Sequence, residues 1–471
     1  MSQTSTPPGV ETRPAKPNVI VFFTDQQRWD TCGIHGNPLG LTPNLDRAAL
    51  EGTDFHRCFT CQPVCGPTRA VLQSGVYPTT NGTHTNGRAL PKDSTTLARL
   101  FNQAGYRTGY IGKWHLGDDQ IVPADQRGGY QDWLGVNALE MSSDAYQTRM
   151  WDENNNPVDL PGYRVDACAD AAIRYIDKNK ERPFFLFLSF IEPHFQNHID
   201  SYPAPDGYEE KYTARWTPPD LQALGGTSAQ HLPGYYGMVK RLDEAYGRVR
   251  DALKSLHLDR DTIVLFTSDH GCHFKTRNDE YKRSGHESSI RIPCVATGPG
   301  FEGGGRIKKL VSNLDIPPTL LDAAGLGVPA HFQGASALPL ARDHRAPWRD
   351  DMYVQISESS VARALRTERF KYIVTAPNAH QWHDATAAEY AETELYDLHA
   401  DPWELTNLVE YKTHRGIMDA LRDRMLKRMK EAGEPEPRII PAVPTVSGQR
   451  MVLENELGAG LVPIHQFGRQ Y

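Results

Sequence analysis

The chain has 471 residues, with 51 Lys and Arg against 58 Asp and Glu, and its formal net charge is −7. At roughly 100–200 residues per domain, this length excludes a disulfide-stabilised miniprotein and allows one large domain with an appendage, or two to three smaller domains. A pI near 6.2 without a long basic block argues against nucleic acid as a partner. Apolar runs such as residues 184–188 are far shorter than the ~18 residues of a membrane helix, so we expect no membrane partner.

The N-terminal residues 1–17 are polar and rich in Pro, a composition that predicts a disordered leader. The leader lacks the apolar core of a secretory signal, so we expect a cytoplasmic protein. The seven Cys are odd in number, and no CxxC pair is matched by a second pair at zinc-finger spacing. Cys58, Cys61 and Cys65 do lie close in sequence, and a zinc site or a disulfide there is an alternative.

Three runs rich in β-branched and aromatic residues end at charged or polar residues: NVIVFFTDQQ (18–27), FFLFLSFIEPH (184–194) and TIVLFTSDHG (262–271). Such runs are typical of strands covered on both faces in a parallel sheet. Helical patterns lie between them at 94–105, 166–180 and about 235–256. The alternation predicts an α/β fold with a large, mostly parallel sheet sandwiched by helices.

From about residue 350 the pattern changes to short alternating runs, MYVQIS, VARALRT and RFKYIVT, followed by ELYDL and a helix near 415–431. This pattern predicts a smaller C-terminal antiparallel sheet with one helix. The expected organisation is therefore a leader (1–17), a large α/β domain (18–345), an α+β subdomain (346–432) and a tail (433–471). The tail keeps apolar positions among Pro and Gly, so we expect it to wrap around the molecule or to join subunits of a homo-oligomer.

Each predicted strand of the large sheet ends in polar residues: Asp25-Gln26, Glu192-Pro193-His194 and Asp269-His270. Ligands of open α/β sheets bind beyond the carboxyl ends of the strands. We therefore expect these distant segments to meet at one edge of the sheet.

The most informative segment is CQPVCGPTRAVLQSG (61–75), in which Cys65, Pro67 and Arg69 form C-x-P-x-R and Ser74-Gly75 follow. It resembles the signature of the type I, formylglycine-dependent sulfatases of the alkaline phosphatase superfamily. The resemblance extends in order over residues 18 to about 410, through TPNLDRAALEGTDF, GYRTGYIGKWHLG, Pro193-His194, TSDHG, Lys282 before HESSIRIP, and ELYDLHADPWELTNL. It implies an alkaline phosphatase-like fold and an enzyme that hydrolyses sulfuric esters.

Transfer of a sulfate group requires a nucleophile, cations that offset charge and an acid for the departing oxygen. The resemblance implies that a formylglycine-generating enzyme converts Cys65 to formylglycine, whose hydrate attacks sulfur. It also implies that Arg69 holds this group. Lys113 and His115 are implied to contact the sulfate, with His115 as the base, and His194 and Lys282 to act on the leaving alcohol.

Arg283 is an alternative to Lys282 for the role at the leaving alcohol. Asn86 and His84 resemble a loop that borders the pocket, and His286 is expected to pack near the site.

A divalent metal is implied at the strand ends, bound by Asp25, Gln26, Asp269, His270 and the residue 65 diol. Oxygen ligands favour Ca²⁺. Many family members carry Asp-Asp and Asp-Asn at these pairs, and the departure here removes a negative charge and adds a nitrogen ligand, so Mn²⁺ is an alternative. For Gln26 alone, a role behind the metal ligands or in ending the strand is the alternative.

The expected substrate is a sulfated carbohydrate, small or oligomeric. Residues 118–165 and 195–235 are rich in Trp, Tyr, Arg and Asp and suit a polar cleft for a sugar. Choline, alkyl or aryl sulfates are alternatives. A phosphonate monoester or phosphodiester hydrolase is another, because its metal pairs also tend to be Asp-Gln and Asp-His. A non-catalytic anion-binding protein is the alternative from a different class.

Overall fold

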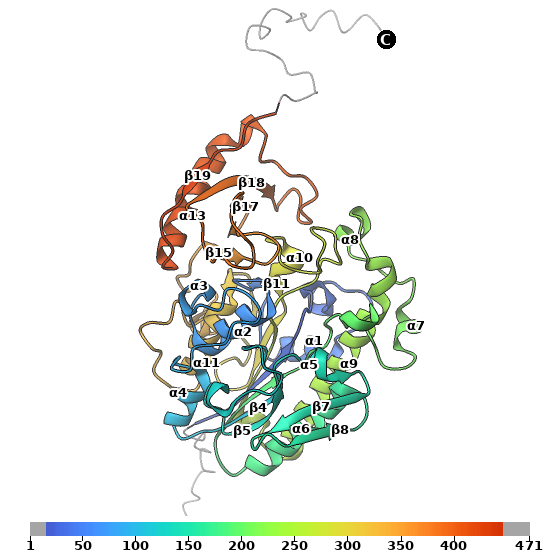
Figure 1. Cartoon of the computed structure of the whole chain (residues 1–471). Coiled ribbons are helices and arrows are strands. Elements are labelled where there is room, and N and C mark those ends of the chain that lie inside the picture. The colour runs from blue at the N-terminus through green and yellow to red at the C-terminus, as the bar shows by residue number, and fades with distance from the viewer. Residues whose placement is uncertain (1–15, 446–471) are drawn as a thin grey trace, which may run out of the picture.

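The computed structural model describes residues 16–445 (Figure 1). The predicted leader (1–17) lies almost wholly outside the described residues, and so does most of the predicted tail (433–471) with its proposed role in oligomer formation. Within 16–445 the strands form a large sheet of eleven strands, a sheet of three and a sheet of five. None of the described helices is both long and apolar enough to cross a membrane.

The central strands of the large sheet pair in parallel, and antiparallel pairs flank them on both sides. The neighbours β10–β1, β1–β9, β9–β4 and β4–β5 pair in parallel, as predicted, whereas β12 joins β10 and β7 joins β5 in antiparallel fashion. The sheet as a whole is therefore mixed. Its strands in spatial order are β13 (Gly305–Ile307), β2 (Thr53–Phe55), β12 (Cys294–Thr297), β10 (Thr262–Ser268), β1 (Asn18–Thr24), β9 (Phe184–Ser189), β4 (Arg107–Lys113), β5 (Asp132–Val136), β7 (Gln147–Asp152) and β6 (Ser143–Asp144), with β8 (Pro157–Leu160) paired to β7.

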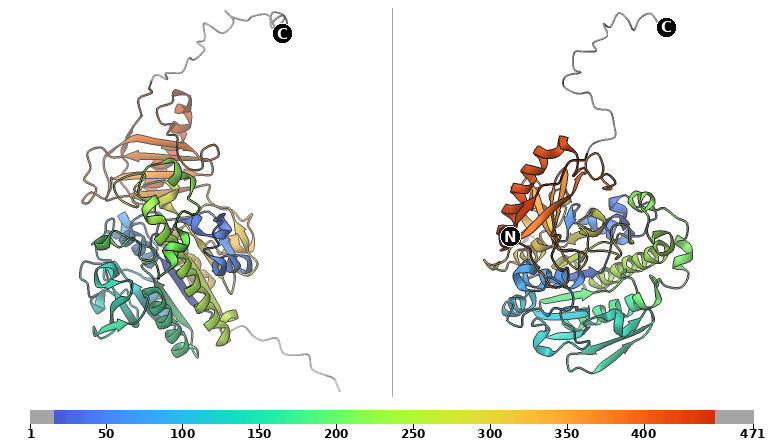
Figure 2. Two further views of the ribbon diagram at one scale, coloured as in Figure 1. Left: turned by 90° about the vertical axis from the view of Figure 1, so that its right-hand side faces the viewer. Right: turned by 45° about the horizontal axis from the view of Figure 1, so that its top comes forward.

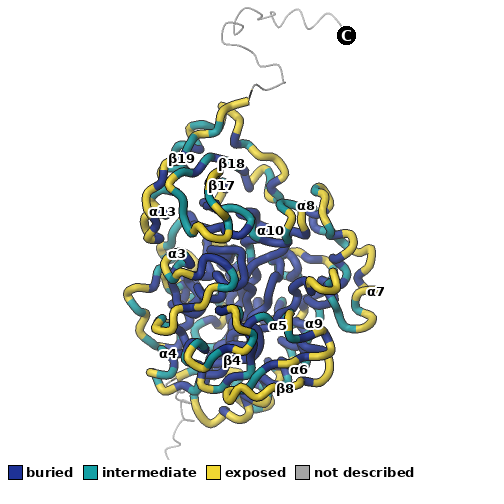
Figure 3. The backbone as a smooth tube through the Cα atoms, viewed as in Figure 1, coloured by how far each residue is buried: buried dark blue, intermediate teal, exposed yellow. Residues whose placement is uncertain are grey.

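Strand β1 is buried along its whole length because both of its faces are covered. Val19, Val21 and Phe23 belong to one apolar core, and Ile20 and Phe22 to another. This alternation is the two-residue period of a strand between two helical layers. Burial is concentrated in this centre (Figure 3).

Two groups of helices cover the faces of the sheet. The core containing Ile20 includes side chains of α1 (Pro43–Glu51), α6 (Arg164–Asn179) and the long α9 (Ser228–Ser255). The opposite core includes α2 (Cys65–Ser74), α4 (Leu97–Gln103) and α11 (Ile316–Ala323). Shorter helices lie in the connections: α3 (Pro78–Asn81), α5 (Leu139–Ser142), α7 (Tyr208–Tyr212), α8 (Pro219–Ala223), α10 (Glu287–Ile290) and α12 (Leu338–Arg342).

The C-terminal sheet lies against the end of the larger body (Figures 1 and 2). Its first four strands are antiparallel, as predicted, and β19 pairs in parallel with β18. Helix α13 (Arg415–Glu431) packs Met418, Leu421, Met425 and Met429 into the same core as Leu365. The strands are β15 (Asp351–Ile356), β16 (Ala362–Thr367), β17 (Phe370–Thr375), β18 (Glu389–Asp397) and β19 (Arg438–Ile440). A three-stranded sheet, of β11 (Arg291–Ile292), β3 (Cys58–Phe59) and β14 (Val311–Ser312), completes the fold.

Candidate active site

The predicted site residues meet at the carboxyl edge of the central strands. Cys65 is the first residue of α2, and its side chain is buried. Its Sγ lies 2.7 Å from Lys282 Nζ, 3.3 Å from His270 Nε2 and 3.5 Å from Asp25 Oδ1. His115 also lies within hydrogen-bonding reach of the thiol.

The surroundings of Cys65 favour a negative charge. Burial raises the pKa of the thiol, but Lys282, Lys113 and His270 outweigh burial and lower it well below the ordinary value. The start of α2 adds the positive end of a helix dipole. The Cys65 sulfur stands in for an oxygen of a modified residue 65. The same cations would therefore stabilise a negative charge on that oxygen.

Arg69 follows Cys65 by one helical turn, so both side chains lie on the same face of α2. The guanidinium donates to Ser189 Oγ (2.7 Å), to Lys113 O (2.6 Å) and to Asp25 Oδ2 (2.8 Å). Because three acceptors in different segments fix it, Arg69 is a rigid cation beside residue 65.

Lys113 ends β4 and lies between two carboxylates. Its Nζ is 3.0 Å from Asp25 Oδ2 and 3.0 Å from Glu140 Oε1. Burial lowers the pKa of Lys113, but Asp25 and Glu140 outweigh burial and raise it above its ordinary value. The preceding Gly112 has φ +109°, and a Cβ there would lie 1.8 Å from Ser189 O, so only glycine lets β4 approach β9 this closely.

Possible metal-ligand atoms of Asp25, Cys65, Asp269 and His270 all lie within 4.8 Å of one another. His270 Nδ1 is 2.9 Å from Gly271 O, a contact that requires a proton on Nδ1, so Nε2, which faces Cys65, is the nitrogen that would bind a metal ion. Asp269 Oδ2 is buried without a hydrogen-bond partner. Burial and the neighbouring Asp25 raise the pKa of Asp269 to about 7, as expected where two carboxylates share a place that a cation would neutralise.

Gln26 completes this group. Its amide nitrogen donates to Tyr202 Oη (2.9 Å) and Cys272 Sγ (3.3 Å), and its Oε1 is buried without a hydrogen-bond partner. An unpaired buried oxygen is costly unless something binds it. The Gln26 backbone N–H donates to Asp269 Oδ1 at 2.8 Å. If its Oε1 joined Asp25, Asp269 and His270, the set would have three oxygen ligands and one imidazole, which fits a divalent cation.

On the other side of Cys65, Lys282 Nζ is 3.3 Å from His194 Nε2. His194 Nδ1 lies 2.6 Å from Phe195 O and must carry the proton for that contact, so Nε2 is free to accept from Lys282. Arg283, the alternative to Lys282 in the sequence prediction, instead pairs with Glu280 and Glu358.

The bordering residues divide into two groups. Asn86 Oδ1 accepts from Gly66 N at 2.9 Å and is therefore tied to the turn that follows Cys65. His84 contacts His383 O, and His286 pairs with Glu394 of β18, so both belong to the junction with the C-terminal sheet. Cys58 and Cys61 are free and buried, and within the described part of the chain neither belongs to a group of potential metal ligands, so the zinc or disulfide alternative for these cysteines is wrong.

Sequence reasoning missed four residues that hold the site together: Glu140, Ser189, Tyr202 and Glu358. Ser189 closes the predicted strand FFLFLS, and its position at a strand end was a usable signal. Tyr202 and Glu140 lie in segments without a motif, and Glu358 reaches the site from the C-terminal region. Only the three-dimensional structure connects these residues to Cys65.

A buried nucleophile position, fixed cations and a cation-binding group within a few ångströms define a site for transferring a charged group from an ester. The sulfatase family model matches residues 17–326, and the model for the N-sulphoglucosamine sulphohydrolase C-terminal region matches residues 279–431. The chain belongs to the sulfatase family and is therefore a hydrolase of sulfuric esters.

Individual relatives agree with this family. The chain is 30% identical to an ulvan-active sulfatase of Formosa agariphila over 89% of this chain and 82% of the relative. It is 26% identical to an N-acetylglucosamine-6-O-sulfatase of Bacteroides thetaiotaomicron, over 93% and 91%. The solved structure of the yidJ protein of Bacteroides fragilis has a TM-score of 0.80 at 24% identity, covering 91% of this chain and 98% of that one, which confirms the fold.

Proposed function

We propose that this sulfatase removes sulfate from a sulfated carbohydrate, with Cys65 as the precursor of a formylglycine nucleophile and a divalent cation beside it. The observation that carries the proposal is the convergence of Lys282, His270 and Asp25 on Cys65 Sγ, within 3.5 Å. Two relatives named for action on carbohydrates, the ulvan-active sulfatase and the N-acetylglucosamine-6-O-sulfatase, support a sugar substrate.

A chemical argument supports the conversion of Cys65 to formylglycine. A thiolate that captured the SO3 group would leave a stable thiosulfate ester, whereas a formylglycine hydrate has a second hydroxyl through which the group can be released. A formylglycine-generating enzyme is the implied partner. Arg69 and Lys113 then hold the charged oxygen atoms on this side, and His115 takes the proton of the second hydroxyl.

Asp25, Gln26, Asp269 and His270, with residue 65, are the proposed metal ligands. A bound divalent cation supplies a Lewis acid for the sulfate oxygen. The three protein oxygen ligands make Ca²⁺ the first choice, and the imidazole of His270 keeps Mn²⁺ as the alternative.

We infer that Lys282 and His194 act on the leaving oxygen. Because Nε2 of His194 accepts from Lys282 Nζ, the ammonium group is the donor nearest to residue 65. Lys282 therefore donates to the departing oxygen, and His194 holds the ammonium group in position. The cytoplasmic location stays a prediction.

The experiment is a sulfate-release assay on protein co-expressed with a formylglycine-generating enzyme. Sulfated sugars, choline sulfate, an aryl sulfate and an aryl phosphonate monoester are compared, with Cys65→Ala as the control. We expect the highest kcat/KM on a sulfated sugar, a mass deficit of roughly 18 Da at residue 65, and no turnover by the variant. A preference of about tenfold for the phosphonate, or activity without the mass deficit, would overturn the proposal.

A further inference from the structure

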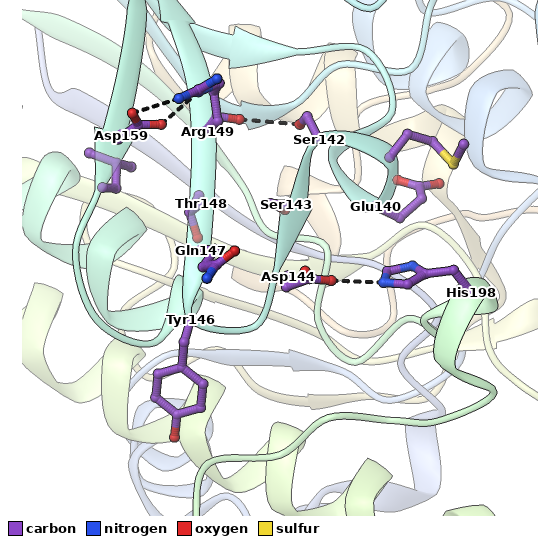
Figure 4. A pocket seen from close by; sticks show the side chains of 12 residues that line it. Glu140, Ser142, Ser143, Asp144, Tyr146, Gln147, Thr148, Arg149, Asp159 and His198 are labelled. Carbon is purple, nitrogen blue, oxygen red and sulfur yellow. Dashed lines mark hydrogen bonds and ion pairs between the residues drawn. The ribbon is translucent and has the colours of Figure 1, made fainter.

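A cavity of about 790 Å³ lies beside the candidate active site. It is open to solvent and is lined by α5 and β6, by the β7–β8 hairpin and, across from the hairpin, by His198 of the segment Asn197–Ile199 (Figure 4). Its volume is within the range of small-molecule sites, about 300–1,000 Å³. Most of the residues that line it are polar, which suits a ligand rich in hydroxyl groups.

Glu140 connects this cavity to the reacting centre. It lines the cavity, and its Oε1 is 3.0 Å from Lys113 Nζ. The wall that contains Glu140 is also joined to the wall that contains His198. Gln196 lies midway in sequence between His194 and His198, and its Nε2 donates to Glu140 O at 3.0 Å. The segment that carries His194 therefore continues into the wall of the cavity.

The arginine and the histidine that line the cavity are already paired. Arg149 makes a two-bond contact with Asp159, at 2.7 and 2.8 Å, and His198 Nε2 lies 2.8 Å from Asp144 Oδ1 (Figure 4). Glu140 Oε2, in contrast, is buried without a hydrogen-bond partner. Among the described side chains that line the cavity, carboxylates outnumber guanidinium and imidazole groups, and neither of these two basic groups is left unpaired.

We propose that this cavity binds an uncharged sugar unit of the substrate and excludes a second acidic group there. The proposal rests on the function proposed above. Hydroxyl groups donate to Asp144 and Asp159, whose side chains are 57% and 68% exposed, whereas another sulfate or a uronate carboxylate would be repelled by these carboxylates without a free cation to pair with it. Met141 and Tyr146 are 77% and 46% exposed beside the cavity and offer apolar surface to the CH groups of a sugar ring.

The test compares three esters on the modified enzyme: a neutral oligosaccharide carrying one sulfate, the same oligosaccharide with a uronate next to the sulfated unit, and 4-nitrophenyl sulfate. We expect the neutral substrate to exceed the uronate substrate in kcat/KM by at least about tenfold. Asp144→Ala and Asp159→Ala should each lower kcat/KM for the neutral substrate by about 10- to 100-fold, mainly through KM. Turnover of the aryl ester should stay within about twofold.

Asp177→Ala is the matched control, because Asp177 is an exposed aspartate of α6 that pairs with Lys180 outside the cavity. Asp159→Lys, which adds a cation, should narrow the gap between the neutral and the uronate substrate. Equal or better turnover of the uronate substrate by the unchanged enzyme, or unchanged KM in both alanine variants, would overturn the inference while sulfate release persists. Absence of sulfate release from every ester would instead refute the proposed function.

Discussion

Arg69 Nη2 lies 2.8 Å from Asp25 Oδ2, although the two residues are 44 positions apart, and both side chains are almost completely buried. The pair joins the start of α2 to the end of β1 and so fixes residue 65 beside the cluster of Asp25, Asp269 and His270. Asp25 keeps its charge here: burial and Cys65 raise its pKa, but Lys113, His194 and Arg69 outweigh them and lower it below the ordinary value.

Arg69→Lys should reduce kcat/KM by about 100- to 1,000-fold, because a lysine cannot reach Ser189, Lys113 O and Asp25 together. The measurement is sulfate release by the modified enzyme, with circular dichroism as a check of folding. Arg248→Lys on α9, an exposed arginine paired with Asp166 and Asp170, is the matched control and should keep its activity. Activity of Arg69→Lys within a few-fold of the unchanged enzyme would contradict the role given to Arg69.

Tyr202 acts through Gln26 and is a positioning residue. Its hydroxyl accepts from the Gln26 amide, which keeps Oε1 directed away from Tyr202 and free to bind a cation. Tyr202→Phe should raise the Ca²⁺ concentration needed for half-maximal activity, and Gln26→Ala should raise it further.

A second readout for these variants does not depend on activity. A cation that binds the folded state at a hundred times its Kd stabilises the protein by about 2.7 kcal/mol, so Ca²⁺ should raise the Tm of the unchanged protein. The Tm increase should shrink in both variants. Tyr236→Phe, in the same aromatic cluster, is the control. An unchanged Ca²⁺-dependent Tm increase in Gln26→Ala would exclude Gln26 as a ligand.

The large elements of this fold were predictable because each carries its own periodicity. The predicted helix at 166–180 corresponds to α6 (Arg164–Asn179), and the helix near 415–431 corresponds to α13 (Arg415–Glu431). The shortest strands were not predictable, since β6, β3 and β14 have only two residues each and no measurable period.

The site was predictable to the extent that its residues follow strands or belong to motifs. The partners that orient them were not, because a contact such as Lys113 with Glu140 depends on a loop whose course no local pattern encodes. The motif ELYDLHADPWELTNL was recognised, but the structure gives one of its residues a structural position: Glu404 Oε1 lies 2.6 Å from Lys371 Nζ, in the junction between the C-terminal sheet and α10.

Lys371 is fully buried, and its Nζ also lies 2.9 Å from Glu287 Oε1. Lys371→Met should lower the free energy of unfolding by about 3–5 kcal/mol, because it leaves two buried carboxylates without their shared cation. Urea unfolding at pH 7 measures the change. Lys430→Met at an exposed position of α13 should change stability by less than about 0.5 kcal/mol. A loss of similar size in both variants would show that the buried network is not responsible.

The final prediction concerns Glu394 of β18, whose Oε2 lies 2.9 Å from His286 Nε2 and accepts from Tyr396 Oη at 2.8 Å. Burial raises the pKa of Glu394, but His286 and the hydrogen bonds outweigh it and lower the pKa from 4.5 to about 2. For a carboxyl group with a lowered folded-state pKa, the stabilisation is complete above the unfolded-state value and is lost as pH falls through the folded-state value. The contribution of this pair to stability therefore disappears between about pH 4.5 and pH 2. It amounts to at most about 3 kcal/mol, and less because the Glu394 side chain is 26% exposed to solvent.

Glu394→Gln should unfold more easily than the unchanged protein at pH 7, and the difference between the two should shrink as urea unfolding is repeated from pH 5 to pH 3. The exposed Glu210→Gln serves as the control and should follow the unchanged protein at every pH. A difference between Glu394→Gln and the unchanged protein that stays constant over this range would mean that the His286–Glu394 pair contributes no pH-dependent stability.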